Sequence, residues 1–106
     1  MKRGADCTTM LEVRTGVDDV DRRLVALLAE RFAFMDAAAR IKPDRSAVRD
    51  EVRKAEVIAN ASAAAADAML PDGLAETLWE ALVEASIDYE LAAFDMTRST
   101  EITTNG

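Results

Sequence analysis

The chain has 106 residues, the usual size of one domain, and 50% of them are hydrophobic and 31% charged, as in an ordinary soluble globular protein. Thirteen Lys and Arg against twenty Asp and Glu give a net charge of −7, which argues against a nucleic-acid binder because such proteins need basic surface. The chain has no histidine and one cysteine, Cys7, which excludes histidine acid–base chemistry, histidine metal ligation, an internal disulfide and a cysteine metal cluster.

The expected location of the protein follows from its apolar runs and its cysteine. No apolar run approaches the roughly 20 residues that a transmembrane helix needs. The segment Met1–Asp6 lacks the apolar stretch of a signal peptide, and a single cysteine fits a reducing compartment. We therefore expect a cytosolic protein that contacts no membrane.

Three segments are expected to form helices and none a strand, so the predicted fold class is all-α. The first helix runs from about Thr9 to Ile41, because apolar residues recur along it at spacings of three and four. Pro43 ends it by disfavouring helical backbone at the preceding residue. The apolar stripe consists of Val13, Val17, Val20, Leu24, Leu27, Leu28, Phe32, Met35 and Ala38.

The second and third helices are separated by a break at Met69–Gly73. The second is expected over about Ala47–Ala68, with Ser46 as its N-cap. The third runs through apolar residues from Leu74 to about Thr97. The predicted organisation is a head at residues 1–8, a helical domain at 9–98 and a polar, frayed tail at 99–106.

The length of the first helix predicts a homodimer. About 33 helical residues span roughly 50 Å at 1.5 Å each, whereas a compact globule of this size is only about 34 Å across. Because the apolar stripe continues along the whole helix, another chain must cover the part that overshoots the globule. We therefore expect an intertwined helical homodimer.

Charged residues interrupt the apolar faces of the first and third helices. Arg31 and Lys42 share a face of the first helix, because eleven residues return to within about 20°. Arg14 is roughly 40 Å from Lys42 along that helix, so it reaches the ligand of Lys42 only from the other chain of an antiparallel dimer. On the third helix, Ser86 and Glu90 share a face at i and i+4.

Each of these features alone is typical of solvated surface charge, as is the charged run Val48–Lys54 that opens the second helix. Together they outline a cationic cavity with one hydroxyl and one carboxyl group. Such a cavity suits a small dianion, because Arg side chains bind carboxylates through two parallel hydrogen bonds.

Four motifs occur in order along the chain. They are Val17-Asp18-x-x-Asp21-x-x-Leu24-x-x-Leu27-Leu28-Ala29-Glu30-Arg31, Ala39-Arg40-Ile41-Lys42, Val48-Arg49-Asp50-x-x-Arg53 and Ser86-x-x-x-Glu90. As a set, over about residues 10–95, they resemble the all-helical class of chorismate mutases. The resemblance implies an intertwined dimer of three-helix chains. It also implies rearrangement of chorismate to prephenate, a step of aromatic amino acid biosynthesis that needs no cofactor, metal or nucleophile.

The resemblance implies roles for seven residues. Two are expected to be catalytic, at the ether oxygen whose bond breaks: Lys42 and Glu90. Five are expected to bind substrate: Arg14 of the partner subunit and Arg31 at its two carboxylates, Asp50 near the ring hydroxyl, Arg53 as a source of positive potential, and Ser86 at the ring carboxylate.

Two positions depart from the family pattern, and three alternatives to the mutase stay open. Lys54 stands where the family has a Glu that holds the ring hydroxyl, and Glu90 stands where many members have Gln. The head and the short connection from Lys42 to Arg53 resemble isochorismate-pyruvate lyases of salicylate biosynthesis, which share the fold. The alternatives are such a lyase, a mutase acting on 4-amino-4-deoxychorismate, and a non-catalytic helical dimer.

The carboxyl group of Glu90 predicts a pH-dependent rate. A Glu side chain donates a hydrogen bond only when it is protonated, so chorismate turnover should fall as the pH rises and the carboxyl group ionises. Glu90→Gln should flatten this dependence, because an amide donates at every pH. A wild-type rate that stays constant from about pH 5 to 9 would contradict the expectation.

Overall fold

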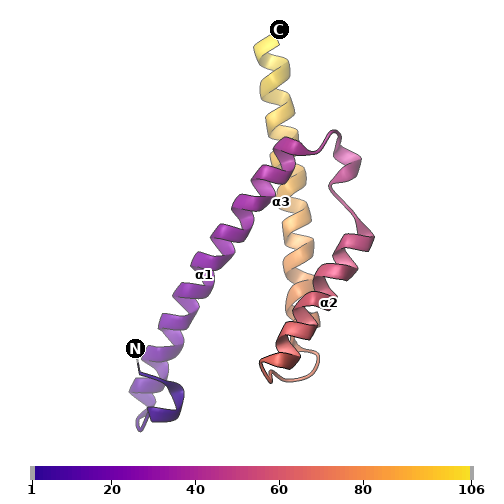
Figure 1. Ribbon diagram of the computed structural model, residues 1–106. Coiled ribbons are helices and arrows are strands. Elements are labelled where there is room, and N and C mark those ends of the chain that lie inside the picture. The colour runs from indigo at the N-terminus through magenta and orange to yellow at the C-terminus, as the bar shows by residue number, and fades with distance from the viewer. Residues whose placement is uncertain (1, 106) are drawn as a thin grey trace. The chain divides into compact units, whose positions relative to one another are not determined.

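A computed structural model describes residues 2–105, and it describes the side chains of residues 2–99. All regular structure in this part of the chain is helical, so the all-α prediction is confirmed for it. The elements are a short 3-10 turn η1 (Gly4–Asp6), the helix α1 (Met10–Ile41), a second 3-10 turn η2 (Arg45–Ala47), and the helices α2 (Glu51–Asp67) and α3 (Leu74–Asn105) (Figure 1). None of the helices described over residues 2–105 is long and apolar enough to cross a membrane.

The chain forms two compact units, and α1 runs through the boundary between them, from Phe34 to Met35. In the first unit, Thr9 and Glu12 start the helix. Thr9 Oγ1 accepts the N–H of Glu12 at 3.2 Å, and Glu12 Oε1 accepts the N–H of Thr8 at 3.2 Å, in a variant of the capping box. Hydrogen bonds from Lys2 and then Thr8 lower the pKa of Glu12 to about 2.

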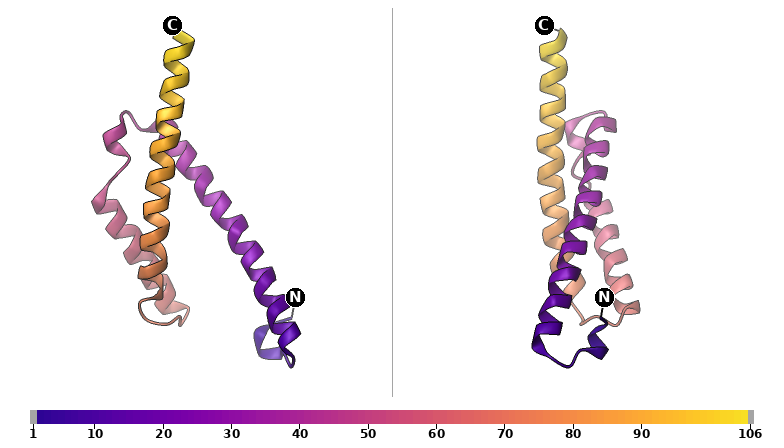
Figure 2. Two further views of the ribbon diagram at one scale, coloured as in Figure 1. Left: turned by 180° about the vertical axis from the view of Figure 1, so that it is seen from behind. Right: turned by 90° about the vertical axis from the view of Figure 1, so that its left-hand side faces the viewer.

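The second unit contains the end of α1 together with α2 and α3. The helices α2 and α3 lie side by side, joined by a tight connection (Figures 1 and 2). A small core holds this unit together: Val48, Val83 and Ile87 are buried, with Val57, Ile58, Trp79 and Leu91 packed against them. Because Val48 comes from the connection after α1, this core fixes that connection to α3.

The start of α2 differs from the sequence-based expectation. The helix begins at Glu51, and its N-cap is Asp50, whose side chain accepts the N–H of Arg53. Ser46 lies in η2 instead, where its hydroxyl contacts the Asp44 carboxylate. The reason is that Asp50 has extended backbone angles and a good capping side chain, while the preceding residues form a separate turn that places Val48 in the core.

The end of α3 also differs from the expectation. The helix does not stop near Thr97 but continues to Asn105, so the predicted tail is helical up to that residue; Gly106 lies outside the described residues. The segment contains neither Pro nor Gly before position 106, so nothing in the backbone ends the helix earlier.

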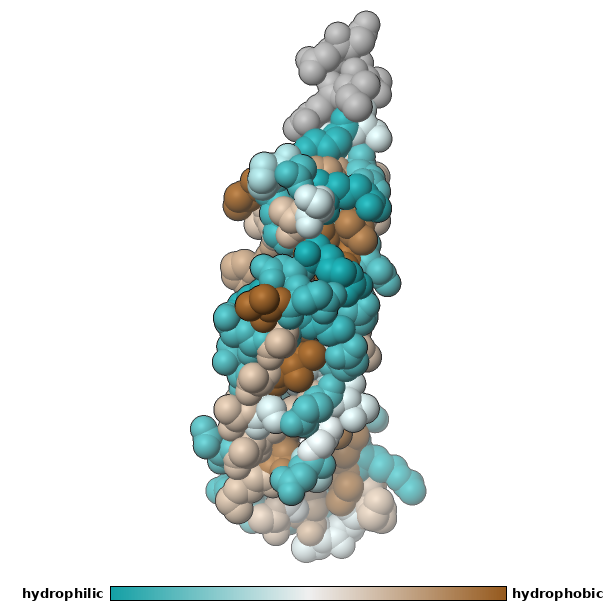
Figure 3. Space-filling view, turned by 90° about the vertical axis from the view of Figure 1, so that its right-hand side faces the viewer, coloured by the Kyte–Doolittle hydropathy of each residue, from teal (hydrophilic) through white to brown (hydrophobic). Residues whose placement is uncertain are grey.

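Apolar surface stays exposed on the single chain. Brown and tan patches interrupt the teal surface in the view of Figure 3. The exposed apolar side chains of the second unit include Val52, Leu70 and Leu78.

The helix α2 ends in a Schellman motif with an unusual residue at its centre. The N–H of Met69 donates to the carbonyl of Ala66, and the N–H of Leu70 donates to the carbonyl of Ala65, both at 3.0 Å. Met69 therefore has a φ of +62°, a conformation that disfavours residues with a Cβ atom. Its side chain is 86% exposed and makes little packing contribution.

We expect Met69→Gly to stabilise the fold by about 1 kcal/mol, because glycine adopts this conformation without steric cost. Gly73 has a φ of +84° and allows the reverse substitution to be tested. Gly73→Ala should destabilise the fold by about 1 kcal/mol. Urea denaturation followed by circular dichroism measures both. A lower midpoint for Met69→Gly than for the wild type would show that the methionine contributes contacts that outweigh the strain.

Candidate active site

The second unit holds an ion pair between residues 48 positions apart in the chain. Lys42 Nζ lies 2.6 Å from Glu90 Oε2, the distance of a strong charge-assisted hydrogen bond. The side chain of Glu90 is 6% exposed and that of Lys42 is 28% exposed. Lys42 Nζ also donates to the carbonyl of Val48 at 3.4 Å. The two residues expected on either side of a substrate oxygen are thus in direct contact.

The ends of two helices place this pair. Lys42 follows the last residue of α1, and its N–H donates to the carbonyl of Ala38 at 2.9 Å, so its backbone continues the helical pattern. Glu90 lies on α3 beyond the buried residues Val83 and Ile87. Because an unpaired carboxylate at such a position is costly, Lys42 is the partner that makes burial of Glu90 possible.

Ser86 lies one turn before Glu90 on α3 and is 3% exposed. Its Oγ donates to the carbonyl of Leu82 at 2.6 Å, a frequent use of serine within helices. A hydroxyl has one proton to donate, so hydrogen bonding to a substrate carboxylate requires its rotation away from Leu82. The role of Ser86 in substrate binding stays a prediction.

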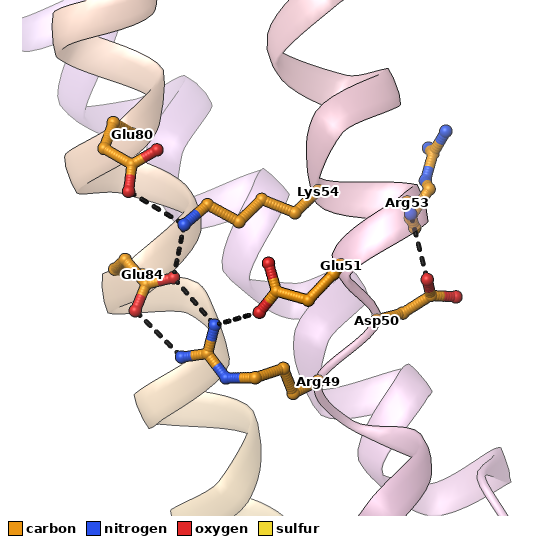
Figure 4. A network of polar contacts seen from close by, with 7 residues as sticks. All are labelled: Arg49, Asp50, Glu51, Arg53, Lys54, Glu80 and Glu84. Carbon is orange, nitrogen blue, oxygen red and sulfur yellow. Dashed lines mark hydrogen bonds and ion pairs between the residues drawn. The ribbon is translucent and has the colours of Figure 1, made fainter.

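Asp50 and Arg53 are joined at the start of α2. Asp50 Oδ1 accepts the backbone N–H of Arg53 at 2.9 Å, which leaves lone pairs of the carboxylate for a ligand hydroxyl. The guanidinium of Arg53 pairs with Glu56 on the same helix. Its side chain is exposed and points away from α3 (Figure 4). Substrate contact by either residue stays a prediction.

Arg14 and Arg31 lie on the part of α1 that belongs to the first unit. Arg14 is exposed and Arg31 is half-buried. Their approach to one substrate molecule, with Arg14 supplied by the partner subunit, stays a prediction as well.

Sequence reasoning missed a cluster of ion pairs between α2 and α3 (Figure 4). Glu84 is its centre: Oε1 lies 2.8 Å from Arg49 Nη2, and Oε2 lies 2.9 Å from Lys54 Nζ. Lys54 Nζ is also 2.8 Å from Glu80 Oε1, and Arg49 Nη1 is 2.9 Å from Glu51 Oε1. The signal available in the sequence was the i, i+4 pair of carboxylates on the third helix, opposite two cations at the start of the second.

This cluster explains how the chain accommodates Lys54. The side chain is 16% exposed, and two carboxylates from α3 compensate its charge. Hydrogen bonds that Lys54 donates to Glu80 and then to Glu84 raise the pKa of Lys54 above its usual value. The lysine therefore acts as a link between two helices.

Comparison with known protein families adds a finding that the geometry alone does not provide. Residues 13–91 match the model of the family described as chorismate mutase type II. The chain belongs to this family. The matched segment includes all seven residues for which the sequence predicts a role, and it ends before Arg98. A search of curated proteins found no match to the chain.

We expect Glu84 to make stability depend on pH in the acid range. Hydrogen bonds from Arg49 and then Lys54 lower its pKa from 4.5 to about 2. A carboxylate whose pKa is lowered by folding stabilises the protein above its unfolded pKa, and this contribution is lost as the pH falls from about 4.5 to about 2.

Urea midpoints measured from pH 6 to pH 2, roughly the range in which carboxyl groups titrate, test this expectation. Glu84→Gln should lower the midpoint at pH 6 and weaken its fall toward pH 2. Asp88→Asn, which removes one exposed acidic charge from the same helix, is the matched control and should leave the slope close to that of the wild type. Equal slopes in the wild type and Glu84→Gln would contradict the assignment.

Proposed function

We propose that the protein is a chorismate mutase whose site contains the Lys42–Glu90 pair and is completed by a second copy of the chain. The observation that carries the proposal is this partly buried pair, at 2.6 Å, in a chain whose residues 13–91 match the chorismate mutase type II family. The cations Arg14, Arg31, Lys42 and Arg53 are opposite in sign to the two carboxylates of such a substrate.

The proposed reaction is an intramolecular rearrangement in which one ether C–O bond breaks and one C–C bond forms, with no atom gained or lost. The enzyme holds the reactive conformer and stabilises negative charge that develops on the ether oxygen. Lys42 Nζ has three protons, of which two face Glu90 and Val48, so the third is available for that oxygen.

The proposed homodimer is supported by the apolar stripe of α1. The helix has 32 residues, or about 48 Å of length at 1.5 Å per residue. Its side chains Val17, Leu24 and Leu27 are 52%, 52% and 59% exposed. Burial of such side chains contributes roughly 1.5–3 kcal/mol each, which favours covering the stripe with the same stripe of a second copy.

The test of the proposed function is a turnover assay of the purified protein with chorismate and, separately, with isochorismate. Prephenate from chorismate with little salicylate from isochorismate would support the mutase. Efficient release of salicylate and pyruvate from isochorismate would assign the chain to the lyase activity instead. If neither substrate is consumed, the proposed function and the lyase alternative are both wrong, and a mutase acting on 4-amino-4-deoxychorismate or a non-catalytic helical dimer takes their place.

We expect Arg31→Ala and Lys42→Ala each to reduce chorismate turnover by about a hundredfold or more, because each removes a donor to the charged substrate. Arg22→Ala is the matched control, since Arg22 lies on the same helix in an exposed pair with Asp19; it should retain wild-type turnover. Sedimentation velocity and circular dichroism check that each variant keeps its assembly and its helix content. Equal losses in all three variants would contradict the assigned roles.

A further inference from the structure

Arg98 forms a hydrogen bond with the backbone of Lys42. It lies on α3, eight residues after Glu90 and outside the segment that matches the family. Its Nη2 donates to the carbonyl of Lys42 at 2.7 Å, and its Nη1 donates to the carbonyl of Ala39 at 3.4 Å. Its guanidinium carbon stacks over the ring of Phe94, 4.0 Å from the centroid.

These contacts give hydrogen-bond partners to carbonyl groups at the C-terminal end of α1. The last carbonyls of a helix have no partner within the helix, and a cation there also interacts favourably with the helix dipole. Phe94 is buried, so the ring under the guanidinium is itself a fixed support. Arg98 is therefore built into the second unit rather than extended into solvent.

Lys42 is consequently fixed at three points. Its N–H donates to the carbonyl of Ala38, its carbonyl accepts from Arg98, and its ammonium group contacts Glu90. Two of these partners, Arg98 and Glu90, come from the same rigid helix. The separation between them along α3 thus sets both the position of the Lys42 backbone and the direction in which its side chain extends.

We propose that Arg98 is a positioning residue for Lys42, acting through the carbonyl groups at the end of α1. The importance for turnover rests on the proposed function, whereas the positioning itself does not. Loss of the guanidinium lets the end of α1 shift relative to α3. Because a misplacement of about 1 Å can cost about a hundredfold in rate, such a shift lowers the effectiveness of Lys42 as a donor.

The turnover test uses Arg98→Met, which keeps an apolar stem over Phe94 but removes the donors. We expect kcat for chorismate to fall by about tenfold or more, with a smaller change in KM, because Lys42 acts mainly on charge that develops in the transition state. Arg98→Lys, which keeps a cation and donors, should recover part of the loss. Arg45→Ala is the matched control: it breaks an exposed pair with Asp95 that also joins the connection after α1 to α3.

A second readout separates positioning from a general loss of stability and does not require activity. The chain has only three lysines, Lys2, Lys42 and Lys54, so lysine-selective 15N labelling gives three side-chain resonances. In Arg98→Met, the Lys42 resonance should move toward that of the exposed Lys2. The Lys54 resonance should stay in place, since its partners are Glu80 and Glu84.

The outcomes distinguish the two proposals. An unshifted Lys42 resonance in Arg98→Met, or a kcat that falls no more than in Arg45→Ala, would overturn the positioning role. Equal shifts of the Lys42 and Lys54 resonances would also overturn it, because they would indicate a global change. A wild type without turnover would contradict the proposed function, while the Lys42 resonance would still decide whether Arg98 positions that residue.

Discussion

The buried carboxylate of Glu90 is the constraint on which the rest of the second unit depends. A charge that is 6% exposed requires a partner of opposite sign, and the ammonium group of Lys42 supplies it at 2.6 Å. This requirement draws the end of α1 to α3 and fixes the connection that follows, from which Val48 enters the core. An ion pair that is expensive to bury is weak evidence for stability, which fits the proposed role of this pair in the site.

Two groups of contacts maintain that arrangement. At one end of α3, Arg98 holds the last carbonyls of α1 and rests on Phe94. Further back along α3, Glu84 links Arg49 and Lys54 and so fixes the start of α2, where Asp50 caps the helix. The hydrogen bond from Arg98 to Lys42 is partly buried and the Arg49–Glu84 pair is exposed, so salt should weaken the Arg49–Glu84 pair more.

Much of the fold was predictable, because helices leave a local signature. The 3.6-residue periodicity locates the start of α1 to within one residue, and Pro43 accounts for its end at Ile41. The prediction was less accurate for the start of α2, which depends on the residue that caps the helix. Ser46 and Asp50 are both acceptable N-caps, and the choice of Asp50 depends on the burial of Val48 between them. For the candidate site, the structure brings Lys42 and Glu90 into contact, while the gathering of the other five residues stays a prediction. The motif order did not predict the direct ion pair, because the expectation placed a substrate oxygen between them.

The sequence by itself determined the helical fold class, the residues that carry charge on apolar faces, and the membership of the chorismate mutase type II family. Only the tertiary structure decided which polar groups pair: Glu90 with Lys42, Lys54 with Glu80 and Glu84, and the Arg98 guanidinium with the carbonyl of Lys42. The physical reason is that periodicity is a property of a single helix. The partner of a charge 26 to 56 positions away depends on how helices pack, and packing is set by side-chain volume and burial over the whole unit.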